Sequence, residues 1–254
     1  MCETRMETIS LIVKRTGQPT GDQEERWNRF IVPYAGESMN VLDSLIWAQR
    51  NEDPSLAFRC ACRVGMCGSC GVVINGKESL ACRTMVRDLR GDSDEIRVEP
   101  MRHLPVVRDL VTDTSDFHAK VNRAAPSTEL GGAQFAAASV SPLSRERRAI
   151  EPQRECIYCG LCYSACSIVG LDDEYLGPAA LNRAFVMLAD SRNQQSQDAL
   201  ASVANEHGLW RCHTLFECEA VCPKGISPTL AIQRLKRKVI TNKLKRLLKI
   251  IHPG

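Results

Sequence analysis

Several segments of the first hundred residues alternate apolar and polar positions or are rich in β-branched side chains, as β-strands are. One stretch departs from this alternation. Met39–Gln49 spaces its apolar residues as a helix does, and Asn40 is suited to cap that helix. The predicted strands are Glu7–Arg15, Arg26–Tyr34, Gly71–Asn75 with a turn at Gly76, and Glu95–Glu99. This region is therefore predicted to form a small mixed sheet with one helix across it.

The second half of the chain lacks strand alternation. Helices are predicted at Gly177–Asp190, Asp198–His207 and Pro228–Ile251. Residues 124–144 are rich in Ala, Ser, Gly and Pro and are predicted to be a linker or surface wrap. The pattern indicates an α+β protein whose second domain is helical, with the boundary between residues 105 and 150.

Length and composition fit this division. A chain of 254 residues can form two modest domains, each with its own core. No apolar run is long enough to span a bilayer, and residues 1–11 lack the apolar core of a secretory signal, so we expect a soluble protein that stays where it is made. The formal net charge of +3 says little about partners, and we expect no nucleic-acid partner.

The thirteen cysteines are the unusual feature of the composition. Apart from Cys2 they fall in three groups, at residues 60–82, 156–166 and 212–222. Disulfide scaffolds usually belong to short secreted chains, and nothing in this sequence indicates export. In a reducing compartment, dense cysteine groups predict metal.

The first group has the spacing of a plant-type [2Fe–2S] site. Three predicted ligands come from one loop, and the fourth follows the next predicted strand: Cys62, Cys67, Cys70 and Cys82. Glycines interleave the loop, which allows its backbone to approach inorganic sulfide closely. Structural zinc is the alternative, but zinc prefers two separated Cys-x2-Cys pairs. Cys60 and Cys2 are left over and are predicted to be bystander thiols.

The other two groups are copies of the bacterial ferredoxin run, in which the fourth cysteine ligates the other cluster. This crossover predicts a [4Fe–4S] site formed by Cys156, Cys159, Cys162 and Cys222. The second site receives Cys166, Cys212 and Cys218, and Leu215 occupies the position of its missing cysteine. Leucine cannot bind iron, so a [3Fe–4S] cluster is predicted. The alternative is that water or a nearby side chain holds a fourth iron.

Three cluster motifs in this order resemble one family, the iron–sulfur subunits of succinate dehydrogenase and fumarate reductase, known as respiratory complex II. The resemblance covers about residues 7–240. Its most specific segments are CRVGMCGSC at 62–70, CIYCGLCYSAC at 156–166, GPAALNRAF at 177–185 and RCHTLFECEAVCPKGISP at 211–228, and LPVVRDLVTD at 104–113 is also similar.

The resemblance implies a β-grasp, plant-ferredoxin-like domain at 1–110, a connecting wrap at 111–150, and an all-α bacterial-ferredoxin-like domain at 151–254. It implies a subunit of succinate:quinone oxidoreductase that carries electrons from the FAD of a flavoprotein, through the three clusters, to quinone. The dicarboxylate site would lie in the flavoprotein, so no catalytic residue is expected in this chain. Membrane anchor subunits, with or without haem b, would hold it at the cytoplasmic face of the cell membrane.

The quinone type depends on details in which the chain departs from the family pattern. Ser167, Ile168, Gly170 and Leu171 replace the Pro-Ser stretch of family members that reduce ubiquinone. His213 matches a position near quinone in succinate dehydrogenases, and Gln233 and Lys236 match menaquinone contacts of a fumarate reductase. Trp210, His213 and Lys236 can each donate a hydrogen bond to a quinone oxygen. Menaquinone is therefore favoured, with ordinary helix surface as the alternative for Gln233 and Lys236.

The C-terminal segment is strongly basic. From Ile232 it carries eight Lys or Arg residues beside an apolar stripe at helical spacing, namely Ile232, Leu235, Val239, Leu244, Leu247, Leu248 and Ile251. Such a helix can lie on anionic lipid or against a membrane anchor. It can equally pack on its own domain with a solvated charged face, and both interpretations stay open.

Two other functions are compatible with parts of the pattern. One is the iron–sulfur subunit of another modular redox enzyme, such as a glycolate or heterodisulfide-type system. Such subunits tend to carry two complete four-cysteine runs and need no β-grasp domain, so Leu215 and the Cys62–Cys82 motif argue against this function. The other is a zinc-stabilised binding module, which the ferredoxin spacings disfavour.

Overall fold

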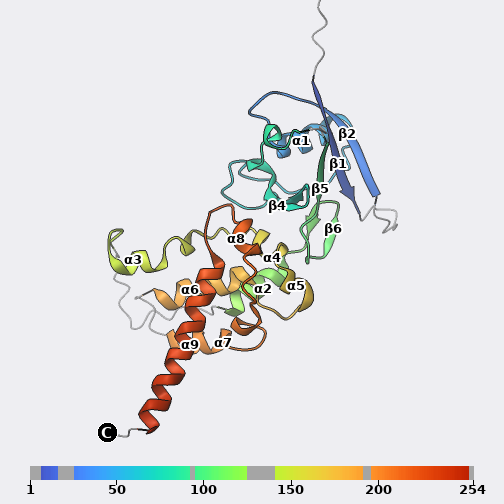
Figure 1. The fold of residues 1–254 in the computed structure, drawn as a ribbon. Coiled ribbons are helices and arrows are strands. Elements are labelled where there is room, and N and C mark those ends of the chain that lie inside the picture. Colours follow the sequence, from blue (N-terminus) through green and yellow to red (C-terminus); the bar gives the residue numbers. More distant parts are fainter. Residues whose placement is uncertain (1–6, 17–25, 92–94, 125–140, 191–195, 252–254) are drawn as a thin grey trace, which may run out of the picture. The chain divides into compact units, whose positions relative to one another are not determined.

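The computed structural model describes residues 7–16, 26–91, 95–124, 141–190 and 196–251 (Figure 1). The backbone groups into two compact units. The first comprises residues 1–114 together with Ile157–Ala165, and the second comprises Ser115–Cys156 and Cys166–Gly254. The segment that carries two of the predicted [4Fe–4S] ligands, Cys159 and Cys162, thus groups with the N-terminal unit.

A five-stranded mixed sheet forms the centre of the first unit. Its strands are β1 (Thr8–Arg15), β2 (Arg26–Pro33), β3 (Gly71–Ile74), β4 (Lys77–Leu80) and β5 (Glu95–Glu99), in the order β2-β1-β5-β3-β4. β1 pairs parallel with β5, and the other neighbours are antiparallel. The four predicted strands are confirmed. β4 is the return strand of the predicted hairpin, with Asn75 and Gly76 in the turn at positive φ.

The predicted helix across this sheet is confirmed as α1 (Val41–Asn51). Val41, Leu42, Leu45 and Ala48 are buried, as the helical spacing of apolar residues predicts. The side chain of Asn40 accepts a hydrogen bond from the Asp43 amide, and the Asp43 carboxylate accepts one from the Asn40 amide. This reciprocal pair is a capping box, which fixes the start of the helix.

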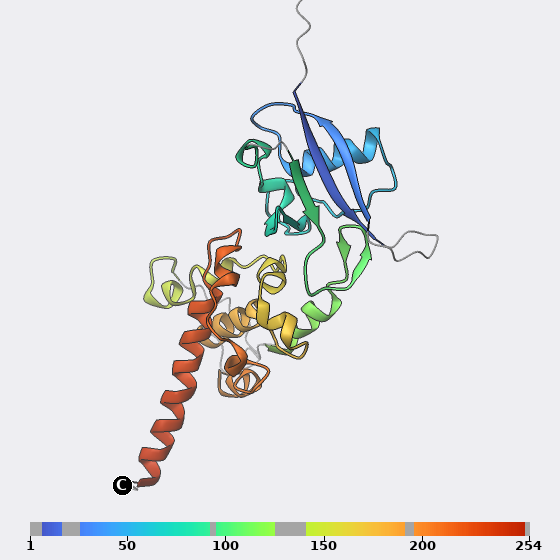
Figure 2. The same cartoon turned by 45° about the vertical axis from the view of Figure 1, so that its right-hand side comes forward.

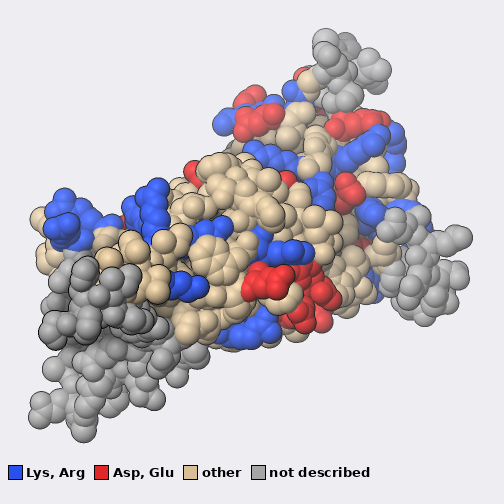
Figure 3. Space-filling model, turned by 60° about the horizontal axis from the view of Figure 1, so that its bottom comes forward, with Lys and Arg blue, Asp and Glu red and all other residues tan. Residues whose placement is uncertain are grey.

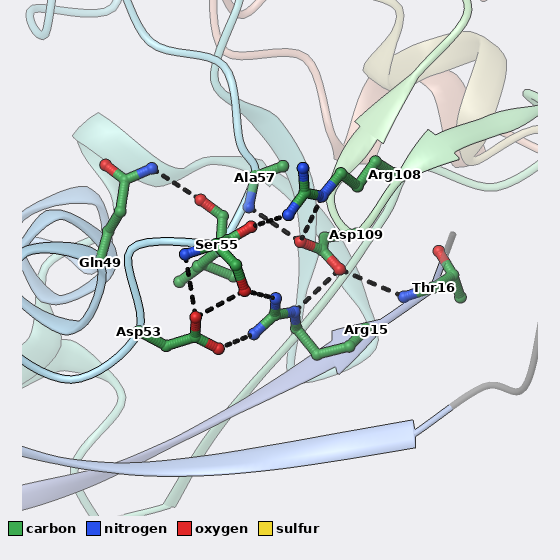
Figure 4. A network of polar contacts seen from close by, with 9 residues as sticks. Arg15, Thr16, Gln49, Asp53, Ser55, Ala57, Arg108 and Asp109 are labelled. Carbon is green, nitrogen blue, oxygen red and sulfur yellow. Dashed lines mark hydrogen bonds and ion pairs between the residues drawn. The ribbon is translucent and has the colours of Figure 1, made fainter. Parts of the chain in front are cut away.

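A second, two-stranded sheet was not predicted. β6 (Val106–Arg108) and β7 (Val111–Thr112) form a short hairpin whose turn contains Asp109 at φ +49°. Figure 4 shows the reason for this backbone conformation. The buried Asp109 carboxylate accepts hydrogen bonds from Arg15 Nε at 2.8 Å and from the amides of Thr16 and Ala57.

The same network includes the turn after α1. Arg15 is fully buried, and its guanidinium also donates to Asp53 at 2.6 Å and to Ser55 at 2.9 Å (Figure 4). Hydrogen bonds from Ser55 and Arg15 lower the pKa of Asp53 to about 2. Two carboxylates therefore neutralise one buried guanidinium, which joins the end of β1 to two loops that are distant in sequence.

The described part of the second unit consists of helices and turns. Its helices are α2 (Ser115–Ala124), α3 (Arg145–Ile150), α5 (Ser167–Leu171), α6 (Pro178–Ala189), α7 (Ser196–Val203), α8 (Glu217–Ala220) and α9 (Pro228–Ile251). The core lies around α6, which has α2, α7 and α9 packed against it and buries Leu181, Ala184, Phe185 and Leu188. Of the predicted linker, residues 125–140 lie outside the described residues.

The predicted helices at 177–190 and 228–251 are confirmed. The helix predicted at 198–207 ends at Val203 instead, because the chain turns there and Gly208 donates back to the Asn205 carbonyl. α2 was missed, although it buries Phe117, Lys120, Val121 and Ala124 at helical spacing. Among the described residues, no helix combines the length and apolar character needed to cross a membrane.

Candidate iron–sulfur sites

The loop at residues 62–70 is built to surround a sulfur-rich group. Arg63, Gly65 and Gly68 all have positive φ, so the backbone of this loop turns tightly at three positions. The Cys62 sulfur accepts hydrogen bonds from the amides of Met66 at 3.2 Å and Cys67 at 3.3 Å. Backbone donors aimed at a cysteine sulfur are what a thiolate ligand requires, which supports Cys62 over Cys60 as the ligand.

The fourth predicted ligand of this site reaches the loop through the β3–β4 hairpin. Cys70 precedes β3, Cys82 follows β4, and their sulfurs lie 3.3 Å apart. Burial raises the pKa of the Cys70 thiol, whereas the Ser69 hydroxyl lowers the pKa of the exposed Cys67 to about 6. The four cysteines thus sit in unlike surroundings, with Cys70 and Cys82 buried and Cys67 at the surface.

The two ferredoxin-type loops repeat each other in backbone conformation as well as in spacing. In the loop from Cys156 to Cys162, the second and fourth residues after the first cysteine have positive φ, +52° at Tyr158 and +81° at Gly160. The loop from Cys212 to Cys218 repeats this with +63° at both Thr214 and Phe216. A one-turn helix, α4 (Leu161–Ser164) or α8, then begins at the equivalent position of each loop.

This repeat places Leu215 where the first loop has Cys159. Both residues stand between the two positive-φ positions, three residues after the first cysteine of their loop. A cysteine ligand is therefore replaced by leucine in a loop of otherwise matching conformation. The Leu215 side chain is half exposed.

A cavity that is partly open to solvent lies beside Leu215 in the second unit. Cys166, Cys212 and Cys218 all line it. The remaining lining is mostly apolar, with Ile168, Tyr175, Pro178, His213, Thr214, Leu215, Phe216, Glu217, Thr229 and Ile232. Three cysteines that line one largely apolar cavity fit a cluster that has three protein ligands.

Polar contacts bring these cysteines together from distant parts of the chain. The Glu217 carboxylate accepts hydrogen bonds from the amide of Ser167 at 2.8 Å and from its hydroxyl at 2.7 Å. Because Ser167 follows Cys166 and Glu217 precedes Cys218, this contact joins the two cysteine segments directly. Sequence spacing gave no indication of it.

Two further residues of the cavity act on the cysteine sulfurs. Thr229, at the start of α9, has its hydroxyl 3.3 Å from the Cys218 sulfur. Burial of Cys218 raises its pKa to about 11, and burial also raises the pKa of Cys166. Tyr175 is almost fully buried, and its pKa is raised by burial and by the neighbouring Cys212. The sequence did not predict a role for the hydroxyls of Thr229 and Tyr175, since neither residue belongs to a cysteine motif.

The predicted [4Fe–4S] ligands divide between the two units. Cys159 and Cys162 lie in the first unit, and Cys156 and Cys222 lie in the second, so the convergence of all four stays a prediction. In the part of the chain that the structure describes, no three His, Cys, Asp or Glu side chains converge as ligands of a single metal ion do.

Within the first unit, the two loops that carry cluster cysteines touch. Gly68 packs so closely on Cys159 that a Cβ at position 68 would lie 2.6 Å from the Cys159 Cβ and 2.9 Å from its Cα. Nearby, the buried Glu78 carboxylate accepts a hydrogen bond from Ser164 at 3.1 Å and pairs with Arg102 at 2.9 Å. These contacts hold α4 against the sheet.

The predicted quinone-proximal residues lie around the loop that follows Cys212. Lys236 donates to the Cys212 carbonyl at 2.8 Å and lies 5.9 Å from the centre of the Trp210 ring. Gln233 donates to the Thr214 hydroxyl at 2.8 Å, and His213 is exposed on the same loop. Gln233 and Lys236 therefore attach this loop to α9, whichever further role they have.

Comparison with known proteins identifies the family. Residues 10–119 match the family of 2Fe-2S iron-sulfur cluster binding domains, and residues 152–226 match the 4Fe-4S dicluster domain. The fumarate reductase iron-sulfur subunit of Mycobacterium tuberculosis (strain CDC 1551 / Oshkosh) is 39% identical over 252 residues, which cover 96% of this chain and 97% of that protein. The chain belongs to the iron–sulfur subunits of fumarate reductase and succinate dehydrogenase.

Two further similar proteins support this assignment. The succinate dehydrogenase iron-sulfur subunit of Paracoccus denitrificans is 36% identical over 79% of this chain and 76% of its own length. A chain in the structure of the Mycobacterium smegmatis Sdh1 complex superposes with a TM-score of 0.82 at 29% identity, covering 94% of this chain and 98% of that one. The predicted α+β fold class, with a plant-ferredoxin-like domain before a helical ferredoxin domain, is confirmed.

Proposed function

We propose that this iron–sulfur subunit carries electrons between the FAD of a succinate- or fumarate-converting flavoprotein and membrane quinone. Its partners would be that flavoprotein and a membrane anchor, with or without haem b, at the cytoplasmic face of the cell membrane. The family membership supports this, because the relatives are named as subunits of fumarate reductase and succinate dehydrogenase. It also favours cluster binding over a zinc module or another modular redox subunit.

The observation that carries the proposal is the repeated loop conformation with leucine in place of cysteine. Eleven cysteines would hold three clusters, and the cavity beside Leu215 would hold a [3Fe–4S] cluster on Cys166, Cys212 and Cys218. Iron–sulfur clusters accept and release single electrons, at potentials set by charge, hydrogen bonds and solvent exposure. The residues of this chain would hold the clusters, shield them and tune them.

The surroundings of Cys212 support a quinone site beside the cavity that would hold the [3Fe–4S] cluster. Trp210, Leu215 and Phe216 are large apolar side chains that are half exposed, and His213 and Lys236 lie beside them with donor groups. An apolar rim with a few hydrogen-bond donors is what a quinone ring with two carbonyl oxygens requires. Menaquinone remains the favoured substrate, because Gln233 and Lys236 match menaquinone contacts of a fumarate reductase.

Substitution of Leu215 tests the three-iron assignment. Anaerobically purified protein should contain iron and acid-labile sulfide, and the oxidised protein should give the EPR signal of a three-iron cluster. In Leu215→Cys a fourth ligand completes the site, so that signal should disappear and the chain should gain one iron. Leu215→Ala is the matched control, since it removes the leucine without adding a ligand, and it should keep the signal.

The complete electron path is tested in the assembled complex. With its flavoprotein and anchor, the complex should either reduce a menaquinone analogue with electrons from succinate or reduce fumarate with electrons from the reduced analogue. Protein that contains zinc without iron or sulfide would contradict the proposal, and so would a Leu215→Cys variant whose oxidised EPR signal matches that of the unsubstituted protein.

A further inference from the structure

Helix α9 changes character halfway along its length. In its first half, Ile232, Leu235 and Val239 are buried, and α9 packs on α6. Beyond Val239 no described side chain of the helix is buried. Figures 1 and 2 both show the last turns of α9 running past the other helices of the second unit. The first half of α9 therefore fits a helix that packs on its own domain. The second half fits a helix that lies on lipid or against a membrane anchor.

The exposed half of α9 still carries large aliphatic residues on one side. Here the distal face of α9 denotes Ile240, Leu244, Leu247 and Leu248, which are 55%, 54%, 56% and 50% exposed. Their spacing of four, three and one residues places them on one side of an α-helix. A row of four exposed aliphatic side chains is costly in water, so this face is suited to burial against a partner.

The charges around this face define the chemistry of that partner. No Asp or Glu follows Glu219 in the sequence, whereas nine Lys or Arg residues do. Residues 240–251 are called the distal half of α9. Lys243 and Lys245 lie exposed within it, and Arg237 and Lys238 lie exposed in the turn before it. Elsewhere, on the face drawn in Figure 3, acidic and basic side chains are interspersed. The one-sided charge of α9 is thus local.

We propose that the distal half of α9 binds the surface of an anionic bilayer. Its aliphatic face would enter the headgroup region, and the flanking lysines and arginines would contact lipid phosphates. A helix with a narrow apolar face and only basic charges has the composition of an interfacial helix. An apolar protein groove would satisfy the aliphatic face alone, whereas an anionic lipid surface satisfies both the aliphatic face and the excess of positive charge.

Vesicle binding by the full-length, cluster-containing chain tests this directly. The chain should co-sediment with phosphatidylcholine vesicles that contain phosphatidylglycerol, and binding should fall as salt concentration rises. Phosphatidylcholine vesicles alone should bind it weakly. The Leu244→Gln, Leu247→Gln double variant should bind the anionic vesicles about tenfold more weakly, because two aliphatic side chains no longer enter the headgroup region.

Matched controls use exposed residues outside the distal half. Leu230→Gln alters an exposed leucine in the first turn of the same helix and should leave binding unchanged. Lys243→Glu should weaken binding, whereas Lys77→Glu makes the same charge change at an exposed lysine of β4 and should not. A chain that ends at Thr241 removes most of the distal face and should bind no better than the double variant.

Three outcomes would overturn the proposal. One is equal binding to neutral and anionic vesicles, and another is a double variant that binds like the unsubstituted chain. The third is a dimer in solution that the double variant dissociates, since a second copy of the chain would then cover the distal face. Visible absorbance reports the clusters independently, so failure of lipid binding can be distinguished from failure of the proposed redox function.

Discussion

At the scale of single residues, Thr229 is positioned to tune the proposed [3Fe–4S] site. Its hydroxyl lies 3.3 Å from the Cys218 sulfur inside the cavity. A hydrogen bond to a ligating thiolate stabilises the more negative, reduced cluster and so raises its reduction potential. Thr229→Val keeps the shape of the side chain but removes the donor, and we expect a lower potential in an EPR-monitored redox titration.

The conservative variant separates tuning from packing. Thr229→Ser restores a hydroxyl and should restore most of the potential. The [2Fe–2S] centre is a control within the same protein, and its potential should not change in either variant. An unchanged three-iron potential in Thr229→Val would show that this hydroxyl does not act on the cluster.

The residues that sequence alone could identify are those with fixed spacing. The cysteines and Leu215 follow from spacing, because ligands on one short loop must keep a set separation to reach one cluster. Thr229 and Tyr175 could not be found in this way. Thr229 reaches the cavity from α9 and Tyr175 from the loop between α5 and α6, and only tertiary packing sets their distances from the cysteine sulfurs.

At the scale of elements, the buried pair of Arg15 and Asp109 joins β1 to the β6–β7 hairpin. Both side chains are fully buried. Asp109→Asn would leave a buried guanidinium with only Asp53 to compensate it, which should lower the free energy of unfolding by about 3–5 kcal/mol. Thermal unfolding followed by the visible absorbance of the [2Fe–2S] centre would measure the loss.

An exposed ion pair of the same sheet provides the comparison. Arg29 of β2 and Glu95 of β5 pair at 2.6 Å across the intervening strand β1, but their side chains are 54% and 33% exposed. Glu95→Gln should therefore cost less than about 1 kcal/mol, because water and salt screen an exposed pair. Equal losses in Asp109→Asn and Glu95→Gln would contradict the structural role given to the buried pair.

The contact between Gly68 and Cys159 couples two cluster loops. An alanine at position 68 would bring its Cβ within 2.9 Å of the Cys159 Cα, so one backbone must move. We expect Gly68→Ala to reduce the EPR amplitude of the reduced [4Fe–4S] cluster and to lower thermal stability, since the ligand loop of that cluster is displaced. Iron content per chain should fall as well.

Gly76→Ala is the matched control for this substitution. Gly76 has φ +82°, close to the +74° of Gly68, so both alanines carry a similar backbone strain of about 1–2 kcal/mol. A Cβ on Gly76 would meet nothing within 4 Å. Gly76→Ala should therefore keep its clusters, and equal cluster loss in the two variants would assign the effect to backbone strain alone.

Elements with a local signal were predictable from sequence. Asn40 and Asp43 define the start of α1, and Asn75-Gly76 defines a hairpin turn, because both depend on neighbouring residues only. The β6–β7 hairpin lacks such a signal. Its turn conformation at Asp109 is stabilised by Arg15, which is 94 residues away in sequence, and no local pattern encodes that contact.

At the scale of the whole molecule, the N-terminal unit is completed by a segment from far along the chain. Sequence patterns divide a chain only at points along it, as does the predicted boundary between residues 105 and 150. Ile157–Ala165 groups with residues 1–114 because of side-chain packing. Leu161 and Ser164 are fully buried there, and Ser164 also accepts a hydrogen bond from the Arg102 amide at 2.8 Å.

A fragment of residues 1–114 should therefore be less stable than the same unit in the full chain. Without Leu161 it forfeits the burial of a leucine, about 1.5–3 kcal/mol, and Glu78 loses its hydrogen bond to Ser164. Linking residues 157–165 to the fragment should restore stability in thermal unfolding followed at the [2Fe–2S] absorbance, whereas the same linked segment with Leu161→Asp should not. If the fragment of residues 1–114 unfolds at the same temperature as the linked fragment, residues 157–165 do not stabilise this unit. The buried contact of Leu161 would then contribute nothing to the fold that holds the first cluster.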